Sequence, residues 1–265
     1  MLTRCFNLAT RLLQYWARPF TDRASVRWQQ YQWRHHADSR TFDWDWQAIL
    51  YNRIALVNLL LRRFPDPTYL EIGCASNALF SSVPVKHKIG VDPAQGGTHR
   101  MPSDDFFAQN TDTFDVIFID GLHTYDQVRR DVPNALACVR PGGWIALHDM
   151  LPRTWIEHHV PMVTQADWTG DVWKVAIELA QTPGIRFHIV QIDHGVGVIE
   201  VQDSQAALAA LNASNAPAEL ASKEFSYYYD NVKSLPILTW DEAFDWLSPR
   251  ALGVRAGVLN TSYKG

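Results

Sequence analysis

Four short apolar segments that each end in polar residues constrain the fold of this chain more than any other feature. The segments are TYLEIG (68–73), KIGVDP (88–93), FDVIFIDG (114–121) and GGWIALHD (142–149). The third is almost continuously apolar, as expected for a strand that is covered on both faces. Stretches with helical spacing separate the four, and alternating strands and helices predict a parallel sheet with right-handed crossovers.

Two further strands and three helices complete this pattern. Helices are expected where apolar residues recur every three or four positions, at 46–64, 125–139 and 170–180. Strands at 185–192 and 195–201 flank an Asp-His-Gly sequence that is typical of a hairpin turn. The sequence therefore predicts an α/β fold, Rossmann-like and doubly wound, with a mostly parallel sheet and an antiparallel edge hairpin.

Composition divides the chain into three parts. Residues 1–45 are rich in Trp, Arg and His without a clear period, and we interpret them as an N-terminal extension. The alternating pattern occupies 46–202, and 203–265 is expected to form a helical, aromatic C-terminal arm. The 265 residues, 47% of them hydrophobic, suffice for one domain with extensions. The extensions are also candidates for a homo-oligomer contact.

Charge and cysteine usage exclude several classes of protein. The formal net charge of −4 predicts no nucleic-acid partner. Cys5, Cys74 and Cys138 are far apart and form no CxxC pair, which indicates a reducing, cytoplasmic setting. The apolar run at 54–61 is too short for a transmembrane segment.

The first twenty residues contain no acid and alternate arginines with apolar side chains. Two interpretations are open: a helix that docks on the main domain or on a second subunit, or an amphipathic helix at a membrane interface. A secretory signal is not expected, because a long apolar core and a small-residue cleavage site are missing.

The segment LEIGCASNA (70–78) resembles the first motif of class I S-adenosylmethionine-dependent methyltransferases, an acid followed by a glycine-rich loop. A loop that passes close to a cofactor needs small or absent side chains. The resemblance implies that Glu71, Gly73, Ala75 and Asn77 bind the cofactor, although the family often has glycine at the last two positions. Asparagine tolerates left-handed backbone better than most residues. The alternative is an ordinary tight turn between a strand and a helix.

Three further residues are candidates for cofactor contacts. Asp92 follows Gly73 by nineteen positions, close to the spacing at which an acid after the second strand binds ribose hydroxyls. NAD-binding folds use the same acid, but the missing G-x-G-x-x-G pattern favours the methyl donor. In the methyltransferase fold the region of 102–110 lies near the adenine, which implies Ser103 and Asp104. The alternative is a helix that begins with Ser103 as its N-cap.

Polar residues also follow the third and fourth strands: Asp120 and His123, then His148 and Asp149. Neighbouring strands are about 5 Å apart, so two carboxylates and an imidazole could meet around Mg²⁺ or another divalent cation. The cation would bind two acceptor oxygens and lower the pKa of one of them. His123, with an unperturbed pKa of about 6.5, could then remove the proton. The alternative is acids that cap helices beside a satisfied histidine.

The longer pattern IDG-x-H-x-Y followed by HD, within roughly 65–200, resembles a bacterial family similar to metal-dependent O-methyltransferases of small molecules and macrolide sugars. This resemblance implies that Asp120 and Asp149 bind the metal, that Asp120 also borders the cofactor, and that His123 is the base. His148 stands where an acid is frequent. We expect it either as a third metal ligand or as an inward hydrogen-bonding residue.

The predicted function is S-adenosylmethionine-dependent methyl transfer, with divalent-metal assistance, to a hydroxyl of a small molecule such as a sugar or glycan unit. The alternatives are an inactive cofactor-binding protein on the same fold and a metal-independent methyltransferase. A hydrolase is disfavoured because G-x-S-x-G is missing. Aromatic and imidazole side chains after the HD pair could cover the acceptor, or else be core anchors: Trp155, His158, His159, Trp168 and Trp173.

Overall fold

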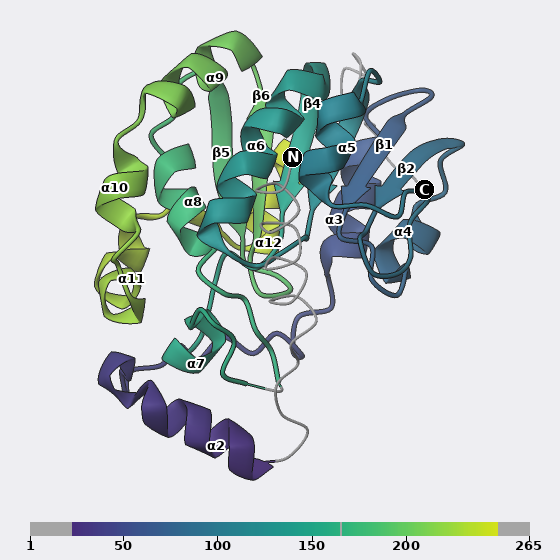
Figure 1. Cartoon of the computed structure of the whole chain (residues 1–265). Coiled ribbons are helices and arrows are strands. Elements are labelled where there is room, and N and C mark those ends of the chain that lie inside the picture. Colours follow the sequence, from purple (N-terminus) through teal and green to yellow (C-terminus); the bar gives the residue numbers. More distant parts are fainter. Residues whose placement is uncertain (1–22, 165, 249–265) are drawn as a thin grey trace, which may run out of the picture.

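A seven-stranded sheet forms the centre of the protein (Figure 1). The structure is a computed structural model that describes residues 23–164 and 166–248. In chain order the strands are β1 (Thr68–Ile72), β2 (His87–Val91), β3 (Phe114–Ile119), β4 (Val139–Leu147), β5 (Ile185–Val190), β6 (Val196–Val201) and β7 (Ile237–Leu238). Their order across the sheet is β2-β1-β3-β4-β6-β5-β7.

The pairing confirms the predicted doubly wound, mostly parallel sheet. β1 lies between β2 and β3, and β3 also pairs with β4, all in parallel. β6 runs antiparallel to both β4 and β5 and forms the predicted hairpin with β5. The short β7 pairs in parallel with β5 on the outer side of that hairpin. A segment of the C-terminal arm therefore completes the sheet, which the sequence pattern did not predict.

Helices cover both faces of the sheet because strand side chains alternate between two apolar clusters. Ile117 and Ile145 belong to one cluster, and Val116 and Trp144 belong to the other. The first face is covered by α5 (Ser103–Gln109), α6 (Tyr125–Cys138), α8 (Trp173–Leu179) and α9 (Ser204–Ala213). The second is covered by α3 (Arg53–Leu61), α4 (Ala78–Ser82) and α12 (Trp240–Leu247).

Three predicted helices differ in their bounds. The expected helix at 46–64 is only α3, because the Asn52 side chain accepts the amide of Ile54 (3.0 Å) and caps the helix there. Leu50 is consequently 92% exposed instead of buried. α6 continues through Pro133. α8 begins at Trp173 rather than at 170, where Gly170 has a left-handed φ of +60°.

The remaining described elements lie mostly outside the sheet layers. α2 (Arg23–Gln32), η1 (Arg34–His36) and α7 (Trp155–His158) lie together beyond the end of the sheet where β4 leads into α7 (Figure 1). α10 (Ala216–Leu220), α11 (Phe225–Asn231) and η2 (Val232–Ser234) follow α9. The amphipathic stretch expected at 1–20 lies outside the described residues. Within the described ranges no helix has the length and apolarity needed to cross a bilayer.

Candidate active site

The carboxyl ends of β3 and β4 bring together Asp120, His123, His148 and Asp149, which we call the acid edge. Ile119 and Leu147 are partners in the parallel register, and the amide of His148 donates to the carbonyl of Ile119 (3.0 Å). The chain segments that carry the two acids therefore leave the sheet side by side. Asp149 is 4% exposed, so the cluster lies at the bottom of a depression rather than on an open surface.

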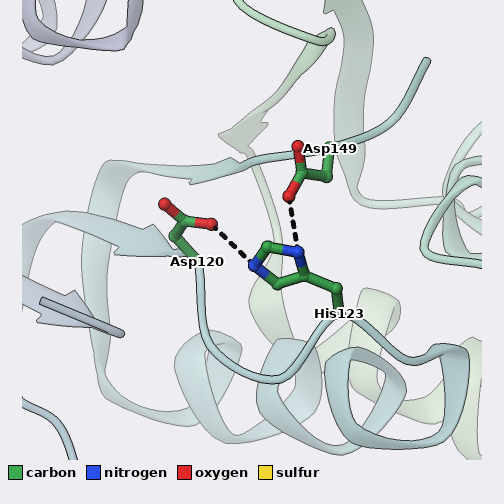
Figure 2. A group of neighbouring side chains, drawn as sticks. All are labelled: Asp120, His123 and Asp149. Carbon is green, nitrogen blue, oxygen red and sulfur yellow. Dashed lines mark ion pairs between the residues drawn. The ribbon is translucent and has the colours of Figure 1, made fainter. Parts of the chain in front are cut away.

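His123 bridges the two acids (Figure 2). Its Nδ1 lies 2.9 Å from Oδ2 of Asp149 and 2.8 Å from the carbonyl oxygen of Trp168. Both partners are acceptors, so Nδ1 carries the hydrogen. Its Nε2 lies 3.3 Å from Oδ1 of Asp120. Nε2 is therefore the ring atom that can take up or release a proton in the cavity.

The backbone of Asp149 is unusual, because its φ of +63° lies in the left-handed region. Aspartate tolerates this region at a cost of roughly 1 kcal/mol, and such strain concentrates at functional sites. The turn is held by amides of the next two residues: Met150 donates to Gly195 and Leu151 to His194. The hairpin between β5 and β6 thus fixes the direction in which the Asp149 carboxylate points.

Electrostatic interactions among the four residues of the acid edge move each of their pKa values away from the ordinary range. Burial alone would lower the pKa of His123, but Asp149 and Asp120 outweigh it and raise the pKa to about 10. The same carboxylates raise the pKa of buried His148. In return, the two histidines outweigh burial and hold the pKa values of Asp120 and Asp149 below the ordinary range. The cluster is a network of paired charges at neutral pH.

Arg53 and Asp193 contact the acid edge, although the strand-end pattern did not predict them. Arg53, the first residue of α3, places Nη1 at 3.2 Å from Oδ2 of Asp120 and at 2.7 Å and 3.0 Å from the two ring nitrogens of His148. Asp193, from the hairpin turn, accepts the Arg53 amide (3.1 Å) and lies 3.6 Å from Nε2 of His148. Of these two residues, only Asp193 could have been noticed in the sequence, because it is an acid in the predicted hairpin turn.

A short segment before α8 holds His123 in place. The Trp168 ring stacks on the imidazole at a centroid distance of 5.4 Å. Gly170 packs so closely that an added Cβ would lie 1.6 Å from the carbonyl oxygen of His123. The Asp171 side chain accepts the amide of Tyr125 (2.7 Å) at the start of α6. Asp171 therefore stabilises the start of the helix that follows His123, and its other carboxylate oxygen pairs with Lys174 (2.9 Å) in the first turn of α8.

The loop after β1 is built from backbone geometry instead of charge. Gly73 has φ +87°, and an added Cβ would lie 1.9 Å from the carbonyl oxygen of Asp120. Ala75 and Asn77 also have positive φ values, of 42° and 65°. The Asn77 side chain accepts the amide of Gly97 (2.7 Å). The loop thus takes the left-handed conformations that a glycine-rich sequence would allow, with asparagine stabilised by an added hydrogen bond.

The carboxylates of Asp92 and Glu71 both accept hydrogen bonds from other groups of the protein. Oδ1 of Asp92 accepts the amides of Ala94 (2.7 Å) and Gln95 (2.8 Å), and Oδ2 accepts the amide of Ala75 (2.9 Å). Asp92 therefore ties the two strand-end loops together. Glu71 is 2% exposed and accepts the Tyr69 hydroxyl (2.6 Å), and burial raises its pKa to about 7.

Two adjoining cavities meet at Gly73 and Gly121, which line both. The glycine-loop cavity, of about 450 Å³, extends toward α5 and α6 and includes Ser103, Asp104 and Gln127 in its wall. The edge cavity, of about 310 Å³, has walls from the loops beyond the sheet. Besides the two glycines, this cavity is lined by Arg53, Ala75, Asp92, Asp120, His123, His148, Asp149, Asp167, Trp168 and His194.

Behind the wall of the glycine-loop cavity lies Asp131, which is fully buried. Its Oδ1 accepts the Ser103 hydroxyl (2.7 Å) and the Gln127 amide (3.1 Å). Its Oδ2 has no hydrogen-bond partner among the described residues. Burial raises the pKa of Asp131 to about 7. Ser103 is thus the first residue of α5 and is fixed by a carboxylate, rather than acting as an N-cap itself.

Of the five residues expected to cover the acceptor, only Trp168 lines the edge cavity. Trp173 is fully buried in the main core and donates to Nδ1 of His158 (2.9 Å). His159 is 2% exposed and packs against Trp155 at a ring distance of 5.9 Å. The interpretation of these residues as core anchors is therefore confirmed for Trp173.

Comparison with protein families finds one match within this region. Residues 84–150 match the family model described as Methyltransferase domain, a span that runs from β2 to the acid edge. This match agrees with the predicted methyltransferase domain over that part of the chain. Among curated proteins no match was found.

Solved structures with a similar fold include several methyltransferases. MycE, from the mycinamycin biosynthetic pathway and in complex with Mg and SAH, is 20% identical over 56% of this chain and 48% of its own, with a TM-score of 0.39. A putative O-methyltransferase from Klebsiella pneumoniae is 17% identical over 74% and 97%, with a TM-score of 0.44. CalS10 from Micromonospora echinaspora, an amino pentose methyltransferase with SAM bound, is 15% identical over 64% and 96%, with a TM-score of 0.41.

This chain spans about half the length of MycE. At these identities and TM-scores the likenesses assign no substrate and no residue role to it.

Proposed function

We propose that the protein transfers the methyl group of S-adenosylmethionine to a hydroxyl oxygen of a small molecule, such as a sugar or glycan unit. The observation that carries this proposal is the junction at Gly73 and Gly121, where the glycine-loop cavity adjoins the cavity that contains the acid edge. A donor in the first cavity would present its methyl group to an acceptor in the second. Holding both reactants in line supplies much of the rate enhancement in such a transfer.

The donor fits the glycine-loop cavity on two grounds. Gly73, which lines this cavity, has the left-handed backbone that close approach requires, and Ala75 and Asn77 continue the loop with positive φ. Asp104, Asp105 and Asp126 in the cavity wall outnumber Arg130 and provide a negative field for the positively charged sulfonium and ammonium groups. Ser103 and Asp104, at the far wall, are the proposed contacts of the adenine end. Asp92, in this proposal, shapes the loop through its three amide contacts and borders the ribose.

His123 is the proposed base. Its Nδ1 hydrogen is fixed by Trp168 and Asp149, so Nε2 faces the place where an acceptor hydroxyl would lie. With a pKa of about 10, however, the imidazole is protonated near neutral pH. A base must be neutral at the operating pH. Compensation of the two carboxylates by a bound cation would lower this pKa and release the proton.

The donor atoms at the acid edge suit such a cation. One ligand atom each from Asp120, His123 and Asp149 lies within 4.8 Å of the others, a separation compatible with a single divalent ion. We propose Asp120 and Asp149 as ligands, with His148 joining them when Arg53 withdraws from its ring. Such an ion supplies Lewis acidity, which lowers the pKa of the acceptor hydroxyl.

Isothermal titration with S-adenosylmethionine, with and without Mg²⁺, tests the proposal. We expect donor binding in both conditions and a methylated product only with an acceptor present. Donor binding without any effect of Mg²⁺ or Mn²⁺ on turnover would indicate metal-independent transfer. Donor binding without turnover on a panel of sugars and other hydroxyl compounds would favour a binding protein. Absence of donor binding would contradict the proposal.

A further inference from the structure

The N-terminal part of the chain has a charge opposite to that of the rest. Residues 1–36 contain six of the 24 lysines and arginines and one of the 28 acids, Asp22. The remaining residues therefore contain 18 basic and 27 acidic side chains. Such an asymmetry indicates a separate partner with negative charge for this end of the protein.

One face of α2 and η1 is occupied by contacts with the protein itself. The Gln30 side chain donates to the carbonyl of Val163 (3.0 Å). The Trp33 ring packs against His159 at 4.9 Å, and Nδ1 of His36 pairs with Glu224 (3.2 Å). These contacts dock the helix on the segment around α7 and leave the opposite face to solvent.

The opposite face, which we call the outward face, consists of Arg27, Trp28, Tyr31 and Arg34. Trp28 and Tyr31 are 58% and 54% exposed and stack at 5.8 Å. The Arg34 guanidinium lies 4.0 Å from the centre of the Tyr31 ring, and both arginines are exposed. The ring stacking and the guanidinium contact group Trp28, Tyr31 and Arg34, and Arg27 precedes Tyr31 by one turn of α2. The result is an ordered stripe of aromatic rings and guanidinium groups.

We propose that the outward face binds an anionic lipid surface. Trp and Tyr favour the boundary between water and lipid because one end of each ring system is apolar and the other is polar. Arginines beside them are attracted to lipid phosphates. Residues 1–20 contain apolar residues and no acid, which favours lipid over nucleic acid: Leu2, Phe6, Leu13, Trp16 and Phe20.

The outward face belongs to the same side of the molecule as the acid edge. α2 contacts the α7 segment, which directly follows the HD pair at the end of β4 (Figure 1). Attachment through this face would therefore hold the site close to the membrane. The inference does not depend on methyl transfer, because it rests on charge and exposure outside both cavities.

Co-sedimentation of the full chain with vesicles tests this inference. The vesicles are phosphatidylcholine alone, or phosphatidylcholine with 30% phosphatidylglycerol, at about 0.1 M and about 0.5 M salt, which differ in Debye length. The double variant Trp28→Ser/Tyr31→Ser and the variant Arg27→Gln alter the outward face. Phe244→Ser is the matched control, since Phe244 is 45% exposed on the distant α12. Circular dichroism verifies that each variant is folded.

We expect binding to the anionic vesicles only, weakened by salt. Arg27→Gln should reduce the affinity about fivefold, the double variant more than that, and Phe244→Ser not at all. Equal binding of the double variant and the natural protein would overturn the proposal. So would a failure to co-sediment at low salt, or binding to a fluorescent 20-base DNA without binding to vesicles.

Discussion

The glycine-loop cavity and the edge cavity differ in the residues that line them, although they share Gly73 and Gly121. The first is bounded by the backbone at Gly73 and Gly121 and by residues of α5 and α6, among them Ser103, Asp104 and Gln127. The second is lined mainly by charged and imidazole side chains, which include the acid edge, Arg53, Asp92 and Asp167. The close backbone contact at Gly73 tolerates little added volume. The edge cavity, by contrast, should respond to changes in the charge of its side chains with little change in fold.

Gly73→Ala should have the largest effect, because the new Cβ would collide with the Asp120 carbonyl at 1.9 Å. We expect a loss of donor binding and a destabilisation of about 3 kcal/mol or more. Gly142→Ala is the control, since Gly142 also has a positive φ (+75°) but no atom within 4 Å of the added Cβ. It should cost about 1 kcal/mol in urea unfolding. Equal costs would show that the collision is relieved by movement of the loop.

His123→Ala should abolish turnover while the donor still binds. Loss of a positioned base lowers the rate by about 10²- to 10⁴-fold. Radiolabelled methyl transfer and titration with S-adenosylmethionine measure the two properties separately. His87→Ala, an exposed histidine outside both cavities, should leave both unchanged. Full activity of His123→Ala would show that another group removes the proton.

Asp149→Asn should weaken cation binding at least tenfold, since it removes a charged ligand that is 4% exposed. Binding of Mn²⁺ can be measured by electron paramagnetic resonance without any turnover. Asp167→Asn is the matched control, because Asp167 also lines the edge cavity but pairs with Arg153 (2.8 Å). An Mn²⁺ affinity that is unchanged by Asp149→Asn would remove Asp149 from the ligand set.

Asp131 predicts how the wall of the glycine-loop cavity responds to pH. Its pKa in the folded protein, about 7, is above the ordinary aspartate value of about 3.8 because the carboxyl is buried. The folded state therefore holds a proton that the unfolded state has released, and stability falls as pH rises from about 4 to 7. Between pH 5.5 and 8, ionisation of Asp131 should lower the free energy of unfolding by about 2 kcal/mol. In urea unfolding, the stability of Asp131→Asn should therefore decline less with pH than that of the natural protein. The same pH profile for both proteins would contradict this prediction.

Arg53→Met should have the smallest effect and the opposite sign. Its guanidinium contacts Asp120 and both ring nitrogens of His148, so it competes with any cation there. Its removal should tighten Mn²⁺ binding about fivefold, which corresponds to one modest charge interaction. Arg100→Met, 3.9 Å from Asp92, is the control. Weaker Mn²⁺ binding by Arg53→Met would mean that Arg53 supports the ligands instead of competing.

Local pattern was enough to predict strands β1 to β6 and the residues at the strand ends. Strands buried on both faces are recognisable as apolar runs, and parallel neighbours must end at one edge. Asp120, His148 and Asp149 are therefore neighbours in the structure as expected. His123 joins them because its loop follows Asp120 directly.

The contacts that depend on chain segments far apart were not predictable in the same way. Arg53 reaches the acid edge because Asn52 ends the preceding loop and starts α3 there. β7 pairs with β5 only after the chain has passed through α9 to α11. The Tyr69 hydroxyl donates to the buried carboxylate of Glu71, two residues away on the same strand, and the sequence did not predict this contact either. Tertiary packing decides such orientations.

Diffraction from a crystal grown with S-adenosylhomocysteine and Mn²⁺ tests the central claim most directly, because the anomalous signal of manganese marks its position. The account predicts a single manganese peak between the carboxylates of Asp120 and Asp149. It also predicts that the homocysteine sulfur lies beside Gly73 and faces the acid edge. A manganese peak away from these two acids, or product density on the far side of the sheet, would contradict it.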